Sequence, residues 1–297
     1  MTGYYHPLYA ASLAEFGEPR ELPCSGAWLL ERAIAGGPHR DAMGCYPIFS
    51  ASNWSGLDKD LAALAPRLVS VALVADPFGE YLPRDLSSWF DKVAAFKEHY
   101  IVDFSKPLSI SRHHRYYGRR AVAAVSIEAG PPPERFADEW SQLYRSLVRK
   151  RGLKGIKAFS KAAFERQLVV PGLVLFRAFE EGAMVGAHLW YVQRNVAYSH
   201  LAASTERGYA VMCPYAIYSA VIEYFRSRAQ YIDLGAGAGL TTGQDGLSRF
   251  KAGWANGTRP AYFCGRILNA ERYEELSREF RPQETDYFPA YRRGELE

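Results

Sequence analysis

Residues 173–202 read LVLFRAFEEGAMVGAHLWYVQRNVAYSHLA, and this stretch decides the fold. Its three apolar runs, at 173–179, 184–191 and 196–202, are rich in β-branched and aromatic residues and predict β-strands. The pairs Glu181-Gly182 and Arg194-Asn195 separate the runs, and turns this short join antiparallel neighbours. The stretch therefore predicts a three-stranded antiparallel meander.

The segment that follows the meander predicts one helix and one further strand. Pro214 suits a first helical turn, where the amide has no helical partner, and a helix is expected from there to about Arg226. Residues 231–234 (YIDL) predict a strand, and a glycine-rich loop and the pair Phe250-Lys251 come after it. The order β-β-β-α-β is typical of the α+β class, with a helix on a mostly antiparallel sheet.

The first 130 residues carry weaker patterns. They predict helices at 25–35, 57–68 and 85–98 and strands at 69–75, 100–104 and 121–127. Gly130 and the three prolines after it form the clearest linker in the chain, and a helix with apolar residues at helical spacing follows at 136–151. The domain boundary is placed there, which gives an N-terminal half at 1–130 and a C-terminal half at 134–267.

Composition excludes several classes of protein. The chain has 297 residues, of which 48% are hydrophobic and 23% charged, and a net charge of +4, as in a globular protein. The apolar run at 69–75 is far shorter than the ~18 residues of a membrane span, and no signal peptide is visible. The four scattered cysteines suggest neither a disulfide framework nor a zinc site, so reduced thiols and a cytoplasmic location are expected. No metal is expected, because His113-His114 lacks companion ligands at metal spacing.

The glycine-rich loop allows more than one interpretation. Residues 233–239 read DLGAGAG, which looks like the loop of methyltransferases that bind S-adenosylmethionine. Only 58 residues follow Gly239, too few to complete a doubly wound parallel sheet. A flexible surface turn after a core strand is a second interpretation.

A family resemblance gives a third interpretation, because several motifs occur in a particular order over 173–266. They are residues 181–186 (EGAMVG), a tyrosine-containing strand at 197–204, residues 213–215 (CPY), residues 233–237 (DLGAG) and residues 250–251 (FK). In this order they resemble the Gcn5-related N-acetyltransferase (GNAT) superfamily and, within it, the Fem-like branch of FemAB-type aminoacyltransferases and acetyltransferase-like proteins. The resemblance implies tandem acetyltransferase-like halves, with the tail at 268–297 packed back on the first half.

The resemblance also implies a function. It predicts transfer of an acyl or aminoacyl group onto an amine of a cell-envelope or polysaccharide precursor, such as a small molecule or a nucleotide sugar. The donor would be an acyl-CoA or an aminoacyl-tRNA, and tRNA would then be a partner. The pyrophosphate loop of ordinary acetyltransferases, Arg/Gln-x-x-Gly-x-Gly/Ala, has no counterpart at 204–210, which holds a single glycine. A non-catalytic protein that binds a sugar nucleotide on the same fold therefore stays open as an alternative.

The candidate site residues follow from chemistry and resemblance together. Lys251 comes after the glycine loop, where an amine can reach a phosphate or carboxylate, and the matching lysine in the Fem-like branch is linked to substrate binding. Asp233 ends a core strand and could orient an amine or act as a base, or simply cap the loop. His188 is the third catalytic candidate, although a lone histidine on a strand is more often structural. The substrate-binding candidates are Tyr198, His200, Ser204, Tyr215, Gly235, Gly237 and Phe250.

Overall fold

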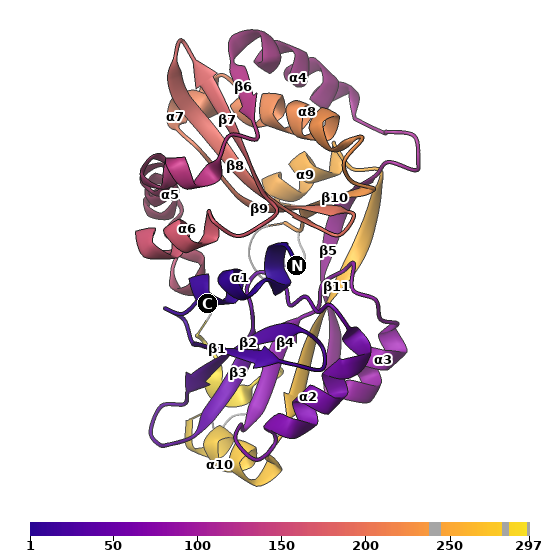
Figure 1. The fold of residues 1–297 in the computed structure, drawn as a ribbon, viewed down its shortest axis with the longest axis vertical. Helices are drawn as coiled ribbons and strands as arrows, with labels where there is room; N and C mark the ends of the chain where they lie inside the picture. Colours follow the sequence, from indigo (N-terminus) through magenta and orange to yellow (C-terminus); the bar gives the residue numbers. More distant parts are fainter. Residues whose placement is uncertain (238–244, 281–284, 296–297) are drawn as a thin grey trace. The chain divides into compact units, whose positions relative to one another are not determined.

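The computed structural model of the chain describes residues 1–237, 245–280 and 285–295 (Figure 1). They form two compact units, named here the central unit (Met1–Gly3 with Lys97–Pro260) and the terminal unit (Tyr4–Phe96 with Ala261–Glu297). The chain passes between the units within β5 (Lys92–Asp103) and β11 (Gly257–Ile267). The predicted limits at 130 and 134 both lie inside the central unit. The chain passes from one unit to the other within continuous strands, and a continuous strand carries no compositional sign of a boundary.

The sheet of the central unit contains the predicted meander. Its strands follow the order β6-β7-β8-β9-β10-β5, where β6 is Ser126–Ala129, β7 Leu173–Glu180, β8 Ala183–Gln193, β9 Val196–Ser204 and β10 Tyr231–Gly235. The pairs from β6 to β9 and the pair β10–β5 are antiparallel, whereas β9 and β10 are parallel. The meander predicted from residues 173–202 is therefore confirmed.

The helices of the central unit cover this sheet. They are α4 (Arg112–Ala124), α5 (Ala137–Arg151), α6 (Lys161–Gln167), α7 (Glu206–Ala210), α8 (Cys213–Phe225) and α9 (Gly246–Ala252). The helix expected from Pro214 is α8, whose buried Ile217, Val221 and Phe225 share a core with Trp190 of the sheet. Figure 1 shows α4 beside α8, and Gly118 of α4 packs so closely that a Cβ there would lie 3.1 Å from Ser219 Oγ.

The terminal unit repeats the pairing pattern of the central unit. Its strands follow the order β1-β2-β3-β4-β11, with β1 at Glu18–Leu22, β2 at Ala27–Ala33, β3 at Arg40–Gly44 and β4 at Ser70–Val74. Two antiparallel pairs, one parallel pair and one antiparallel pair follow each other, as in β7-β8-β9-β10-β5. Its helices are α1 (Pro7–Ser12), α2 (Leu57–Leu64), α3 (Pro83–Trp89) and α10 (Ala270–Phe280).

This repeat confirms the predicted α+β class with tandem acetyltransferase-like halves. The strand β10, which precedes the glycine loop, has an antiparallel neighbour on one side and a parallel one on the other. That arrangement does not fit the doubly wound parallel sheet that a methyltransferase with such a loop requires. The methyltransferase interpretation is therefore wrong.

Three predictions in the first 130 residues are wrong in whole or in part. The helix expected at 25–35 is the strand β2, in which Glu31 is buried and receives a 2.7 Å hydrogen bond from Arg20 Nε. The helix expected at 85–98 ends at Trp89, and β5 begins at Lys92. The strand expected at 121–127 starts only at Ser126, because α4 runs to Ala124. In each case tertiary pairing overrides a weak local preference.

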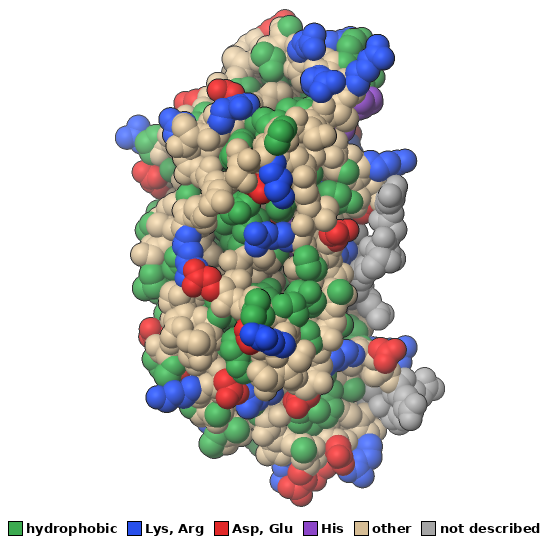
Figure 2. All heavy atoms as spheres, turned by 90° about the vertical axis from the view of Figure 1, so that its right-hand side faces the viewer, with side chains coloured by type: hydrophobic (Ala, Val, Ile, Leu, Met, Phe, Trp, Pro, Cys, Tyr) green, Lys and Arg blue, Asp and Glu red, His purple; other side chains and the backbone are tan. Residues whose placement is uncertain are grey.

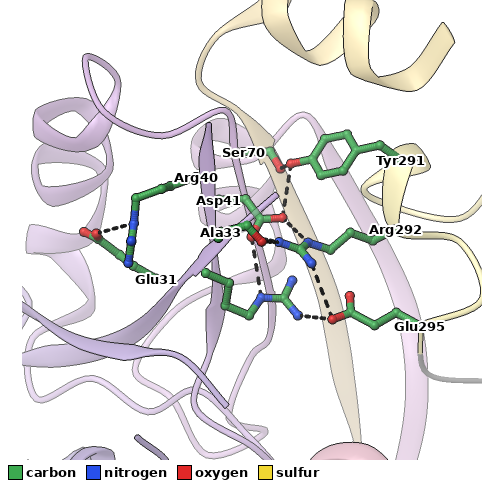
Figure 3. A network of polar contacts seen from close by, with 9 residues as sticks. Glu31, Ala33, Arg40, Asp41, Ser70, Tyr291, Arg292 and Glu295 are labelled. Atoms are coloured by element: carbon green, nitrogen blue, oxygen red, sulfur yellow. Dashed lines mark hydrogen bonds and ion pairs between the residues drawn. The ribbon is translucent and has the colours of Figure 1, made fainter. Parts of the chain in front are cut away.

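Polar contacts anchor the C-terminal segment within the terminal unit (Figure 3). Tyr291 Oη and Ser70 Oγ are 2.8 Å apart, and Arg292 Nη2 donates to Asp41 Oδ1 at 2.8 Å and to the Ala33 carbonyl at 2.7 Å. Short 3₁₀ helices occur at Gly3–Tyr5, Trp54–Gly56, Pro133–Phe136, Gly155–Lys157 and Ala290–Arg292. Within the described ranges, no helix has both the length and the apolar character needed to cross a bilayer.

Candidate functional site

The central unit has a split between its two parallel strands. The pairing of β9 with β10 covers only three residue pairs and ends at Tyr198 and Asp233. Beyond that point β9 continues to Ser204 beside β8, while β10 turns to pair Gly235 with Tyr100 of β5. Among the described residues, no strand pairs with the backbone groups that face the gap beyond this point, and such edges are where extended ligands can pair with a sheet.

The equivalent position of the terminal unit is closed. The strands β3 and β4 pair in parallel at Ala42 and Met43, and the chain then returns to the same strand at Phe49. The Phe49 amide donates to the Val74 carbonyl at 2.7 Å, and the Asp76 amide donates to the Phe49 carbonyl at 3.0 Å. These bonds occupy the backbone groups at the position that corresponds to the split in the central unit. The central unit is therefore the one that offers a candidate site.

The amine of Lys251 lies buried at the end of β10. The helix α9 carries it, and Asp245 caps the start of that helix by accepting a hydrogen bond from the Ser248 amide at 2.7 Å. Lys251 Nζ donates to the carbonyl of Ala236 at 2.6 Å. Burial lowers the pKa of Lys251 to about 8, Asp233 and Asp245 oppose the shift, and the charge of Lys97 adds to it.

Gly235 lets the backbone pass close to this amine. Its φ is +72°, which L-residues with a side chain rarely adopt, and a Cβ built on it would lie 3.1 Å from Lys251 Nζ. The sequence prediction that Lys251 and Gly235 belong to one site therefore agrees with their placement.

A histidine that the sequence analysis missed holds Asp233. Asp233 is buried, and its Oδ1 accepts a hydrogen bond from the Gly235 amide at 2.7 Å. Nδ1 of His99, on β5, lies 3.0 Å from Oδ1 and 2.8 Å from Oδ2 of the same carboxylate. Because a carboxylate only accepts, Nδ1 carries the hydrogen, and Nε2 is the ring nitrogen left for another partner. Nothing near His99 in the sequence marks it, since the contact joins residues that are 134 positions apart.

His188, on β8, and Tyr218, on α8, lie close enough to Lys251 and Asp233 for these charges to shift their pKa values. Burial and the charge of Lys251 lower the pKa of His188 to about 3, so its imidazole is neutral at pH 7. Its Nδ1 is buried and has no hydrogen-bond partner within the described parts of the chain. The ring packs edge-on against Tyr218 of α8, with centroids 5.5 Å apart. Burial raises the pKa of Tyr218 to about 12, and the charge of Asp233 adds to this, while a hydrogen bond with Ser199 opposes it.

Aromatic rings close one wall of the site. Phe250 lies 4.9 Å from Tyr218 and 5.0 Å from Tyr215, measured between ring centroids. The Phe250 carbonyl accepts a 2.8 Å hydrogen bond from His114 Nε2, which fixes the turn of α9 that carries Lys251. The three catalytic candidates, Asp233, Lys251 and His188, are thus together, with Gly235, Phe250 and Tyr215 around them.

The four other predicted binding residues make contacts of their own. His200 Nε2 contacts Gln167 Oε1 at 3.2 Å and its ring packs 4.8 Å from Tyr191, and burial lowers its pKa to about 3. Tyr198 is buried beside Asp233 in the parallel pair. Ser204 Oγ accepts a hydrogen bond from Cys213 Sγ at 3.4 Å. Gly237 packs against α9, where a Cβ would lie 2.1 Å from Ser248 Oγ. The rest of the glycine motif, Ala238 and Gly239, and residues 240–244 are outside the described residues.

The start of α7 does not offer the phosphate cradle of ordinary acetyltransferases. The amide of Gly208 is already bonded to Thr205 Oγ1 at 2.9 Å, and Glu206 places a negative charge in the first turn. The single glycine serves packing, because a Cβ on Gly208 would lie 2.1 Å from the Val185 carbonyl. At the position of the missing pyrophosphate loop, the chain therefore forms a closed turn, in which the Gly208 amide is already hydrogen-bonded within the turn.

Comparisons with known proteins agree with this fold. No protein-family model matches the sequence, and no curated protein matches it. The crystal structure of FemX has 14% identity and a TM-score of 0.66 over 91% of this chain and 93% of FemX. The C-terminal domain of a putative lysylphosphatidylglycerol synthetase from Agrobacterium fabrum has 14% identity and a TM-score of 0.64 over 89% and 88% of the two chains. L-PGS from Bacillus licheniformis has 14% identity and a TM-score of 0.59 over 93% and 96%. The predicted GNAT-like, Fem-like fold is thereby confirmed.

Proposed function

We propose that this chain is an acyltransferase that moves an acyl or aminoacyl group onto an amine. The observation that carries the proposal is the buried Lys251 amine at the mouth of the β9–β10 split, next to the Asp233–His99 pair. The buried ammonium can stabilise the oxyanion that forms in this reaction. The carboxylate–histidine pair can accept the proton of the attacking amine. The structural similarity to FemX supports the same class of reaction.

The reaction needs no covalent enzyme intermediate. The lone pair of the acceptor amine attacks the carbonyl carbon of an activated ester or thioester, and the carbonyl oxygen becomes an oxyanion. The intermediate then collapses, the bond to the leaving oxygen or sulfur breaks, and an amide forms. The protein has to stabilise the oxyanion, accept one proton from the amine and return one to the leaving group.

The residues of the site match these tasks. The pKa of Lys251, about 8, keeps most of the amine protonated at pH 7, so a positive charge is available to the developing oxyanion in a site that excludes water. His99 takes the proton of the acceptor amine at Nε2, while Asp233 holds the ring through Nδ1. His188 stays neutral, and its buried Nδ1, which has no partner among the described residues, is available to a bound group.

The closed turn at α7 favours one kind of donor. An acyl-CoA would have to hold its pyrophosphate without the usual cradle, and Glu206 would repel it. An aminoacyl-tRNA carries its ester without needing that cradle. We therefore favour the aminoacyl ester as donor and keep the acyl-CoA as the alternative. The proposed acceptor is an amine of a cell-envelope or polysaccharide precursor, such as a nucleotide-linked amino sugar.

The same closed turn also favours a second candidate, a protein that binds a sugar nucleotide without catalysis. Thermal unfolding with acyl-CoAs, aminoacyl-tRNA and UDP-linked amino sugars separates the two. A ligand at 100 times its dissociation constant adds roughly 2.7 kcal/mol to the free energy of unfolding. The proposal predicts that a donor and an acceptor each stabilise the wild type but not Lys251→Met, with Lys59→Met, at an exposed position of α2, as the control. Stabilisation by UDP-sugars alone, with no donor effect and no turnover, would favour the binding protein.

A further inference from the structure

The helix α4 presents a basic face, and no acidic side chain of the described residues forms an ion pair with it. Four arginines, Arg112, Arg115, Arg119 and Arg120, lie on its exposed side, and its 13 residues contain no Asp or Glu. Neither Arg112 nor Arg119 forms an ion pair or hydrogen bond with any described residue. Figure 2 shows Lys and Arg side chains gathered at the top of the molecule, where Figure 1 places α4. Like charges that lie close together at a surface repel one another and destabilise the folded state. An anionic partner would relieve this repulsion and would therefore bind this face favourably.

Two exposed apolar side chains flank the arginines, one on each side of Arg119, and they favour a partner that also has an apolar layer. Tyr116 and Val122 are 54% and 55% exposed, and they are among the few large hydrophobic side chains that the protein leaves in solvent. Arg120 lies over the Tyr116 ring, 5.7 Å from its centroid. An RNA backbone offers phosphates to the arginines but no apolar layer for Val122. The headgroup region of an anionic bilayer offers both, because phosphates there lie directly above acyl chains.

The helix is held rigidly on its buried side. Nε2 of His114 donates to the Phe250 carbonyl at 2.8 Å, so its Nδ1 accepts from Ser111 Oγ at 2.7 Å. Burial lowers the pKa of His114, which agrees with a neutral ring. Gly118 and Ala121 are buried toward α8 and the core of the central unit. The exposed face is thus fixed by contacts that reach the residue next to Lys251.

We propose that α4 docks the protein on the surface of an anionic phospholipid membrane, with Arg112 and Arg119 on lipid phosphates and Val122 and Tyr116 in the headgroup layer. The interaction is peripheral, since α4 is a 13-residue helix attached by its other face. The proposal does not depend on the transferase activity. It concerns a surface that is separate from the split.

Sedimentation with lipid vesicles tests this docking. The wild type is mixed with vesicles of phosphatidylglycerol and phosphatidylcholine, or of phosphatidylcholine alone, at low and high salt. The expected result is binding to the anionic vesicles only, weakened by salt, and reduced roughly tenfold or more in the double variant Arg112→Glu/Arg119→Glu. A glutamate at position 112 is favourable in the first turn of α4, so this variant is expected to fold.

Two further variants make the result decisive. Arg149→Glu/Arg151→Glu makes the same charge change on exposed positions of α5 and is expected to bind as the wild type does. Val122→Ser leaves the charge unchanged and is expected to weaken vesicle binding several-fold. Equal loss in the α5 variant, or no preference for anionic vesicles, would overturn the proposal. So would displacement by a structured RNA together with no effect of Val122→Ser, because the face would then be a nucleic-acid surface.

Discussion

Nδ1 of His99 lies 2.8 Å from Oδ2 of Asp233, although one residue is on β5 and the other on β10. The carboxylate fixes which ring nitrogen carries the hydrogen and so leaves Nε2 as the atom that can accept a proton. Asp233 is itself held by the Gly235 amide. The pair is therefore oriented from both ends, as a general base needs to be.

Asp233→Asn tests the orientation of His99. The amide nitrogen of Asn can donate to Nδ1, which would move the ring hydrogen to Nε2 and remove the base. We expect kcat to fall about 100-fold or more, with a much smaller change in KM. The kcat of His99→Gln is expected to fall by the same factor. His39→Gln, on a half-buried histidine of the terminal unit, is the matched control and is expected to keep full activity. A normal kcat in Asp233→Asn would remove the pair from the mechanism.

Lys251→Met exchanges a buried charge for an apolar side chain of similar shape. The pKa of Lys251 is about 8 in the folded protein against 10.5 ordinarily, so below pH 8 its protonation costs the fold about 3 kcal/mol. That cost decreases as the pH rises from 8 to 10.5, because only the unfolded chain then still holds the proton. The stability of Lys251→Met relative to wild type is therefore expected to be greatest at pH 7 and to decline toward pH 10.5. Urea unfolding across this range checks it, and a difference independent of pH would show that the amine is not buried.

The pH dependence of transfer tests which form of Lys251 acts. If the ammonium stabilises the oxyanion, the rate falls as the pH rises through about 8. In Lys251→Arg, whose guanidinium stays charged, the residual rate should not show this fall. A wild-type rate that instead rises through pH 8 would mean that the neutral amine acts as a base.

Gly235→Ala places a methyl group between β10 and the Lys251 amine. The backbone there has φ +72°, and the new Cβ would lie 3.1 Å from Nζ. We expect a loss of about 1–2 kcal/mol in stability from the strained backbone, together with a large loss of activity. Gly182→Ala has a similar φ of +82° but meets nothing within 4 Å, so it reports the strain alone and should stay active. Equal activities in Gly235→Ala and Gly182→Ala would show that Gly235 is not part of the active site.

Two buried histidines predict acid sensitivity. The pKa values of His188 and His200 are both lowered by burial to about 3, against 6.5 ordinarily. Between pH 6.5 and 3 the unfolded chain binds protons that the folded protein does not, so stability decreases as the pH falls. His200→Gln is expected to lose less stability than wild type between pH 7 and pH 4.5 in thermal unfolding. His39→Gln, as control, should follow the wild type.

The sequence was most informative where one strand follows the next. The strands β7 to β9 could be predicted because short turns such as Glu181-Gly182 fix their pairing locally. The strand β2 could not, because its residues favour a helix and only the pairing with β1 and β3 makes it a strand. Local preference is weak where neighbours distant in sequence decide the conformation.

The candidate site shows the same division. Lys251, Asp233 and Gly235 could be found because they stand in motifs of the glycine loop and the aromatic-lysine pair. His99 and Tyr218 could not, because they reach the site from β5 and α8 without a local pattern. Alternation along β9 places His200 inward, but it does not show whether a cleft or a packed core lies there. In the structure the His200 ring contacts Gln167 and Tyr191.

Transfer of a labelled group is the most direct test of the central claim. Aminoacyl-tRNA and acyl-CoA, each labelled in the acyl group, are incubated with amine-bearing envelope precursors and with the wild type, Lys251→Met or Lys59→Met. We predict that label appears in an amide of the acceptor with the wild type and Lys59→Met, and is lost with Lys251→Met. Binding of an acceptor that depends on Lys251, without transfer from either donor, would contradict the account and show that the protein binds its ligand without catalysis.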